Sequence, residues 1–252
     1  GIEDFENVFG EPHVSTYDAF AGQLIDEFGV FNGIESEIRL ETDSARYLRA
    51  LSVARSATKR YENLNWRDIE TQILDLDSEL NNHLVPIDEL RAQISEFVQK
   101  YTRERPAYDA EISEFAKTKK ADFVKFADNS VKHALARLDL LDLVEQYREA
   151  KKRDGVAEYS DIMAWGAKLA QNSTQVQNAM RSRYRIVLLD EYQDTAGSQG
   201  LLLQGLFADG RAVTAVGDPM QNIYGWRGAA AGTLERFVSD FPKSDGSPAD
   251  VF

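Results

Sequence analysis

The sequence contains no cysteine, and this absence removes several classes of site. Without thiols the chain forms no disulfide, no zinc–thiolate centre and no cysteine nucleophile. It also lacks any apolar stretch near the roughly 20 residues that a membrane-spanning helix needs. The first ten residues, GIEDFENVFG, have no basic region followed by an apolar run and do not form a secretory signal. We therefore expect a cytoplasmic protein with no membrane partner.

Basic residues are scarce relative to acidic ones. The chain has 29 Lys and Arg against 42 Asp and Glu, a net charge of −13 at pH 7. From Glu158 onward, 11 acidic and 8 basic residues give −3, so the preceding residues, with 31 and 21, carry −10. Surfaces that bind polyanions are usually basic, and this balance argues against tight nucleic-acid binding by the chain alone.

Helical patterns fill the chain up to about residue 157. In residues 1–38, apolar side chains recur at helical spacing from Phe20 to Phe28, and nearby glycines end this helix. Residues 39–157 predict one helix after another, with apolar stripes that we interpret as core. We expect Pro106 to interrupt this series, because proline lacks a backbone donor. The basic run Lys151–Arg153 is expected to end a solvated helix.

Residues 158–252 change in character. The segments Arg185–Asp190 (RIVLLD) and Arg211–Asp218 (RAVTAVGD) are short aliphatic runs that end in carboxylates, and a helical stretch, Ser198–Phe207, lies between them. Strand, helix and strand in this order predict a parallel sheet in an α/β domain. We expect the two strands to pair, the stretch around Val14 to extend the sheet beyond the first strand, and the outer edge of the second strand to stay open.

The end of the first predicted strand carries two adjacent carboxylates, Asp190 and Glu191. Ligands of parallel sheets bind at the carboxyl ends of the strands. An acidic pair placed there suits a magnesium–phosphate site, in which one carboxylate holds the hydrated metal and the next orients or deprotonates the attacking water.

Longer motifs surround this pair. VLLDEYQDT (Val187–Thr195) followed by VGDPMQNIYGWRGA (Val216–Ala229) resembles motifs II and III of UvrD/Rep-type superfamily 1 DNA helicases. STYDAFAGQLIDEFG (Ser15–Gly29) is similar to the TFHSF motif of that family, and YREAKKRDGVAEYSDIM (Tyr147–Met163) to the run before motif II. Asp18 stands where the family usually has histidine, which puts a phosphate contact by that side chain in doubt.

The resemblance implies ATP and Mg²⁺ as cofactors and assigns roles to three residues. Asp190 would coordinate Mg²⁺ through water, Glu191 would activate the hydrolytic water, and Gln221 would sense the γ-phosphate. For Gln193 and Asp194, the alternative to a role in the motif is that they cap the following helix.

The resemblance also implies contacts with single-stranded DNA. Tyr224 and Trp226 would stack on bases, Arg227 would hold the strand or couple it to the ATP site, and Thr16 and Tyr17 would lie beside the DNA backbone. The implied fold is a partial RecA-like α/β domain of the P-loop class, interrupted at residues 39–157 by an all-helical insertion that contacts duplex DNA. Its two parts would be residues 1–38, with the TFHS-like motif, and residues 158–252, with motifs II and III.

No glycine in the chain is followed by lysine, so the sequence has no phosphate-binding loop of the form G-x-x-x-x-G-K-[ST]. We expect the chain to be a piece of a longer 3′-to-5′ helicase of DNA repair or recombination, whose remaining motor domains complete the site, and to be inactive by itself. Two alternatives stay open. One is the motor subunit of a recombination-type helicase–nuclease, and the other is a non-catalytic DNA-binding or interaction module.

Overall fold

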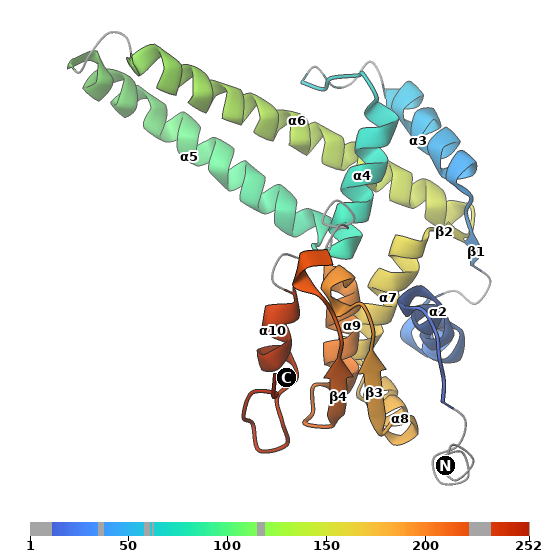
Figure 1. Cartoon of the computed structure of the whole chain (residues 1–252). Coiled ribbons are helices and arrows are strands. Elements are labelled where there is room, and N and C mark those ends of the chain that lie inside the picture. Colours follow the sequence, from blue (N-terminus) through green and yellow to red (C-terminus); the bar gives the residue numbers. More distant parts are fainter. Residues whose placement is uncertain are drawn as a thin grey trace. The chain divides into compact units, whose positions relative to one another are not determined.

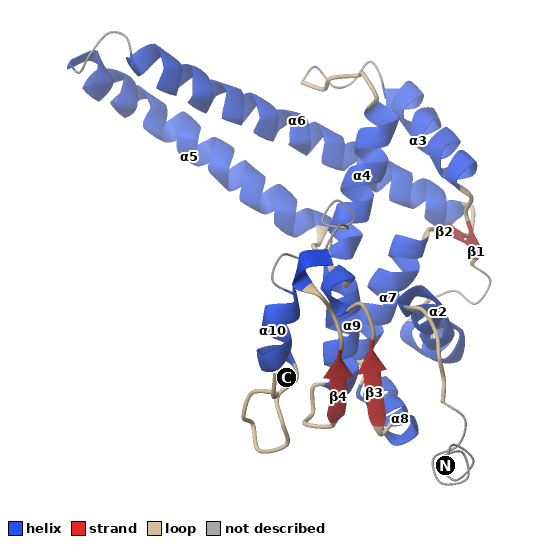
Figure 2. Ribbon diagram, viewed as in Figure 1, coloured by secondary structure: helices blue, strands red, loops and turns tan. Residues whose placement is uncertain are grey.

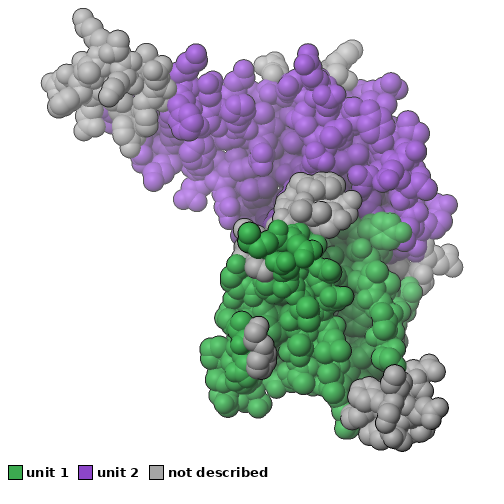
Figure 3. All heavy atoms as spheres, in the orientation of Figure 1, with its two compact units in different colours: residues 1–37, 159–252 green, residues 38–158 purple. Residues whose placement is uncertain are grey.

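The computed structural model describes residues 12–34, 38–57, 61, 63–114, 119–221 and 233–251. These residues are mostly helical, with two short pairs of parallel strands (Figure 1, Figure 2). The chain divides into two compact units: Gly1–Glu37 together with Tyr159–Phe252, and the continuous stretch Ile38–Glu158 (Figure 3). None of the described helices is long and apolar enough to span a membrane.

The first unit is organised around α7 (Tyr159–Asn172), which contacts α2 and α9. The other elements among the described residues of this unit, in chain order, are α2 (Tyr17–Phe28), the 3-10 helix η1 (Val30–Asn32), α8 (Thr174–Arg183), β3 (Ile186–Leu189), η2 (Tyr192–Asp194), α9 (Gly197–Phe207), β4 (Ala212–Ala215), η3 (Pro219–Gln221) and α10 (Thr233–Asp240). A glycine permits the close approach of the three helices. A Cβ on Gly166 of α7 would lie 3.0 Å from the Cβ of Ala21 and 3.1 Å from Cδ1 of Leu202.

Helix α2 follows the sequence pattern. Thr16 begins it, because its hydroxyl oxygen accepts a hydrogen bond from the backbone N–H of Ala19 at 3.2 Å. One face buries Leu24, Ile25 and Phe28, as the helical spacing predicts. The helix ends at Phe28, immediately before Gly29.

Strands β3 and β4 form a two-stranded parallel sheet in which Ile186 pairs with Ala212 and Leu189 with Ala215. The predicted pairing of these segments is confirmed. The predicted third strand around Val14 is wrong: the described residues before α2 form no strand, and Val14 is exposed. A side-chain contact holds this segment instead, since His13 stacks on Tyr184 with ring centroids 5.7 Å apart.

The sheet is not buried on both faces. Leu189 is buried, whereas Leu188 is 77% exposed and Ile186 is 54% exposed. The near-continuous apolar sequence of β3 is typical of a strand covered on two sides. In the described residues, one side of this strand is open to solvent.

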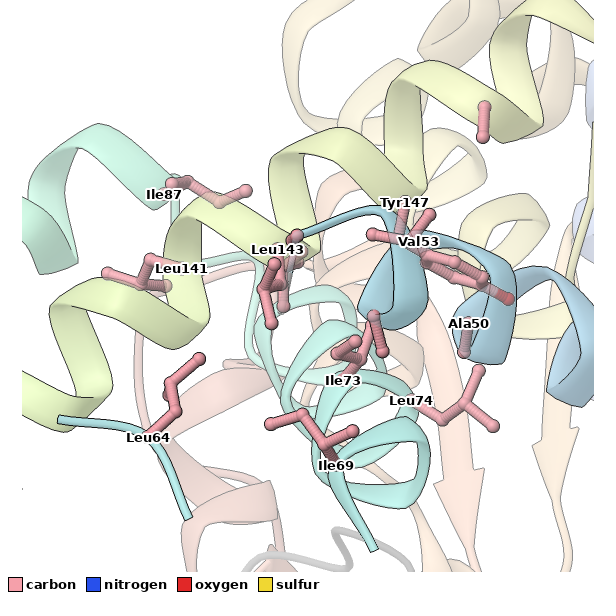
Figure 4. Packing of buried hydrophobic residues seen from close by; sticks show 14 of the residues in the cluster. Ala50, Val53, Leu64, Ile69, Ile73, Leu74, Ile87, Leu141, Leu143 and Tyr147 are labelled. Atoms are coloured by element: carbon pink, nitrogen blue, oxygen red, sulfur yellow. The ribbon is translucent and has the colours of Figure 1, made fainter. Parts of the chain in front are cut away.

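The described residues of the second unit form four helices and a short strand pair. Its elements are β1 (Arg39–Leu40), α3 (Asp43–Ala57), α4 (Ile69–Asn82), α5 (Ile87–Glu114), α6 (Lys119–Arg153) and β2 (Val156–Ala157). Strands β1 and β2 pair in parallel, so the chain enters and leaves the unit at neighbouring points. Apolar side chains from α3, α4 and α6 fill the core, among them Val53, Ile73 and Leu143 (Figure 4).

One expectation about this unit is wrong, and a second is confirmed only in part. Pro106 does not interrupt the helices, because α5 continues through it to Glu114. Packing of α5 along α6 outweighs the lost hydrogen bond, and Arg105 and Tyr101, on the turn before the proline, both bond to Asp128 of α6.

The basic run at the end of α6 is not wholly solvated. Lys152 is exposed, but Lys151 is only 3% exposed and its Nζ donates to Asp77 at 2.7 Å and to Glu158 at 3.2 Å. The Tyr147 hydroxyl also donates to Glu158, and burial together with this carboxylate raises the pKa of Tyr147. A buried network of charges therefore ties α4 and α6 to the residue that follows β2.

Candidate functional site

The carboxylates of Asp190 and Glu191 are both exposed, directly after the buried Leu189 that ends β3. Glu191 has a backbone φ of 48°, in the left-handed region that non-glycine residues seldom adopt. Its N–H donates to Oδ1 of Asp190 at 3.0 Å. The chain therefore turns sharply at the strand end and presents two neighbouring carboxylates to solvent.

Tyr192 anchors this turn. It is 1% exposed, and its ring lies edge-on to Phe237 and Phe241 of α10, with centroids 5.3 and 6.4 Å away. Its backbone N–H donates to the carbonyl of Val216 at 2.9 Å, just beyond β4. Burial raises the pKa of the Tyr192 hydroxyl, which stays protonated at neutral pH. The turn after β3 is thus fixed against both α10 and the end of β4.

A second polar turn follows β4. Asp218 accepts hydrogen bonds from the backbone N–H of Met220 at 2.9 Å and from Nε2 of Gln221 at 2.9 Å. The bond from Gln221, followed by that from Met220, lowers the pKa of the Asp218 carboxyl. Because β3 and β4 are parallel, this turn and the Asp190–Glu191 pair lie at the same end of the sheet.

Gln193 connects the two turns. Its side-chain amide Nε2 donates to Oε2 of Glu191 at 2.6 Å, and its Oε1 accepts from the backbone N–H of Asp218 at 3.0 Å. The residue is 2% exposed. The capping interpretation of Gln193 is wrong, since Gln199 caps α9 by accepting from the N–H of Ala196 at 2.9 Å.

The start of α2 reaches the same region. The hydroxyl of Tyr17 lies 3.4 Å from Oγ1 of Thr195, which is 1% exposed. Burial raises the pKa of Tyr17, and the negative charge of Asp190 raises it further. Thr16 is exposed beside it, with its hydroxyl oxygen used as the helix cap.

The structure thus brings together Asp190, Glu191 and Gln221 at one end of the sheet, and Tyr17 contacts Thr195 in the segment that follows them. The other predicted DNA-binding residues, Tyr224, Trp226 and Arg227, lie outside the described residues.

The donors at this site fit a magnesium ion that is carried by a nucleotide. Asp190 offers a hard carboxylate oxygen at an exposed strand end. Mg²⁺ commonly takes one or two carboxylates and completes its shell with water and substrate phosphates. Among the described residues no group of three or more His, Cys, Asp or Glu is placed to hold an ion.

Comparison with known proteins identifies the family. The UvrD/REP helicase N-terminal domain family matches residues 3–242, nearly the whole chain. The chain belongs to this family. The UvrD/Rep relationship predicted from motifs II and III is therefore confirmed.

Individual relatives match a shorter region of this UvrD/REP helicase domain. DNA helicase II of Escherichia coli (strain K12) is 35% identical over 101 residues, 40% of this chain and 14% of the relative. DNA helicase II of Salmonella typhimurium is 36% identical over 98 residues, 39% of this chain and 14% of the relative. Exonuclease/helicase subunit RexA of Lactococcus lactis subsp. cremoris is 35% identical over 101 residues, 40% of this chain and 8% of the relative. The matched region thus covers only a small part of each relative.

Proposed function

We propose that this UvrD/REP-type chain is part of the first motor domain of an ATP-dependent DNA helicase or translocase that moves 3′ to 5′ along single-stranded DNA. The main observation in support is the parallel pairing of β3 with β4. It places the exposed Asp190–Glu191 pair and the Asp218–Gln221 turn at the same end of one sheet. In parallel sheets this end is where ligands bind.

The chemistry of ATP hydrolysis suits these side chains. Bound Mg–ATP supplies the scissile phosphoanhydride and the neutralising metal charge. Asp190 would hold the hydrated metal, and Glu191 would orient the attacking water and accept its proton. Gln221, held by Asp218 at 2.9 Å, would contact the γ-phosphate and respond to its loss. A phosphate-binding loop is needed in addition, and we propose that another part of the complete protein provides it, with the arginines of a second motor domain.

DNA contacts would come from two segments. Tyr224 and Trp226 would stack on bases, which contributes about 1–3 kcal/mol per base, and Arg227 would hold the strand. Thr16 and Tyr17 would flank the DNA backbone at the start of α2. The Tyr17–Thr195 contact of 3.4 Å would then join a DNA-binding segment directly to the segment that carries Glu191.

The two compact units would divide these tasks. The first, Gly1–Glu37 with Tyr159–Phe252, would be a partial RecA-like domain of the P-loop class, and Ile38–Glu158 an insertion that contacts duplex DNA. The β1–β2 pair supports this division, because it returns the chain close to its entry point, as an insertion requires. The remaining motor domains of the complete protein would be the principal protein partners.

A second candidate is the motor component of a helicase–nuclease. The 35% identity to exonuclease/helicase subunit RexA of Lactococcus lactis subsp. cremoris favours it as an alternative. Both candidates require the same hydrolysis chemistry at Asp190 and Glu191. Degradation of linear DNA by the complete protein, in addition to unwinding, would select the second candidate.

The isolated chain offers a direct test of the division between DNA binding and hydrolysis. Fluorescence anisotropy with a labelled single-stranded oligonucleotide should give weak, salt-sensitive binding that Trp226→Ala and Tyr224→Ala reduce further, because the net charge of −13 leaves stacking as a main contribution. The matched control is Trp66→Ala, which lies in the other unit. Unchanged affinity in a folded Trp226→Ala chain would exclude the stacking role. No ATP hydrolysis is expected from the isolated chain, with or without DNA, and turnover that Glu191→Gln abolishes would contradict this.

A further inference from the structure

The amide of Gln193 is the direct link between the two polar turns of the candidate site. Its nitrogen donates to the Glu191 carboxylate at 2.6 Å, and its oxygen accepts from the Asp218 N–H at 3.0 Å. The first distance is that of a short, charge-assisted hydrogen bond. Asp218 in turn holds the amide of Gln221 at 2.9 Å. One continuous series of hydrogen bonds therefore runs from Glu191 to Gln221.

The surroundings of Gln193 fix this amide in place. The residue is 2% exposed, in η2, between the anchored Tyr192 and the buried Thr195. Gly217 packs directly against it: a Cβ at that position would lie 2.5 Å from Oε1 of Gln193. A side chain at 217 would therefore displace the amide even though its hydrogen-bonding groups remained intact.

Glu191 depends on such support because it is otherwise weakly held. Its side chain is exposed, and its backbone occupies the left-handed region. A carboxylate that must align a water molecule loses much of its effect when it moves by about 1 Å, and such a displacement costs on the order of 100-fold in rate. Gln221 is exposed in the same way and is oriented by Asp218.

We propose that Gln193 is a positioning residue that holds the Glu191 carboxylate in register with Asp218 and, through it, with Gln221. This inference rests on the proposed function, in which Glu191 activates water and Gln221 senses the γ-phosphate. When the γ-phosphate is lost, a shift of the Gln221 side chain would pass to Asp218 and then, through the buried Gln193 amide, to the Glu191 carboxylate. Gln193 contributes to orientation and does not touch the reacting atoms.

The test measures kcat and KM for ATP in the complete protein with saturating single-stranded DNA. Gln193→Leu removes both hydrogen bonds, and Gln193→Glu keeps an acceptor for Asp218 but replaces the amide donor with a second carboxyl group beside Glu191. Gly217→Ala leaves every polar group in place and displaces the amide. We expect each variant to lower kcat about 10- to 100-fold while KM for ATP stays within about twofold. The control Gln199→Leu removes a helix-capping amide elsewhere and should leave kcat unchanged.

Hydrogen exchange of the Asp218 backbone amide in the isolated chain reports on the Gln193–Asp218 hydrogen bond separately from the Gln193–Glu191 hydrogen bond. Exchange should accelerate in Gln193→Leu and stay slow in Gln193→Glu. Should Gln193→Leu fail to fold, Gly217→Ala and Gln193→Glu still decide the question.

Three outcomes would count against the inference. An unchanged kcat in folded Gln193 and Gly217 variants, with hydrolysis still dependent on Glu191, would overturn this inference and leave the proposed function intact. Equal losses in the Gln199→Leu control would also overturn it, because they would point to general destabilisation. Full hydrolysis in Glu191→Gln would overturn the proposed function and this inference together.

Discussion

Packing between α7 and α9 depends on a glycine, and this gives a sharp prediction for the stability of the first unit. A Cβ at Gly205 would lie 2.7 Å from both the carbonyl carbon and the oxygen of Ala170, and 2.9 Å from the N of Gln171. These are backbone atoms of α7, so no side-chain rotation relieves the overlap. Gly205→Ala must push the two helices apart, and overpacking of this kind costs about 1–3 kcal/mol.

Gly200 supplies a matched control in the same helix. A Cβ there meets no atom within 4 Å. Both substitutions stabilise the helix by about 0.5–1 kcal/mol, because alanine has a higher helix propensity than glycine. Gly200→Ala should therefore stabilise the unit by about that amount. The difference in unfolding free energy between the two variants isolates the overlap and should be about 1–3 kcal/mol.

Urea unfolding measures this difference. Fluorescence of Trp165 on α7 reports on the first unit when Trp66 and Trp226 are replaced by phenylalanine. Comparable midpoints for Gly205→Ala and Gly200→Ala would refute the close packing of α7 on α9.

Two further predictions concern charged groups. Lys151→Met should destabilise the second unit by about 1.5–3 kcal/mol in urea unfolding, because Asp77 and Glu158 each lose a buried cationic partner and keep another, Arg148 and Arg46 respectively. Lys152→Met should change little, since Lys152 is exposed, and equal effects would contradict the buried network. The hydrogen bond from Arg211 lowers the pKa of the Asp209 carboxyl in the folded chain. The ionised Asp209 therefore stabilises the fold above the ordinary Asp pKa of about 3.9, and this stabilisation is lost as the pH falls through the lower pKa of the folded state. Unfolding midpoints measured at a series of acidic pH values should show a smaller loss for Asp209→Asn than for the native chain, and identical curves would exclude this contribution.

Local sequence signals were sufficient for much of the fold. The aliphatic runs that contain β3 and β4, separated by one helical stretch, predict the parallel pair that the structure contains. Thr16 and Gly29 mark the two ends of α2. These signals act within a few residues, so they are visible in the chain itself.

Other features depend on residues that are distant in the sequence. Pro106 argues for a helix break, but the packing of α5 against α6 carries the helix through it. Lys151 resembles an ordinary solvated lysine until α4 brings Asp77 to it across 74 positions. Neither partner is recognisable from local pattern.

In the candidate site, too, some residues are recognisable from the sequence and others only from the fold. Asp190 and Glu191 are visible in the sequence as a carboxylate pair at a strand end. The role of Gln193 is not, because its bond to Asp218 spans 25 positions and depends on the register of β3 with β4. A glycine directly before Asp218 was the available signal, since close backbone approach often explains such a residue.

We propose that Asp190 and Glu191 carry out ATP hydrolysis in a DNA-dependent motor. Steady-state ATP hydrolysis by the complete protein, measured with and without single-stranded DNA, tests it most directly. We expect DNA to stimulate hydrolysis in the native protein and Glu191→Gln to lower the stimulated kcat by about 100- to 10,000-fold, as expected for loss of a general base. A Glu191→Gln protein that retains the native stimulated rate would contradict the account.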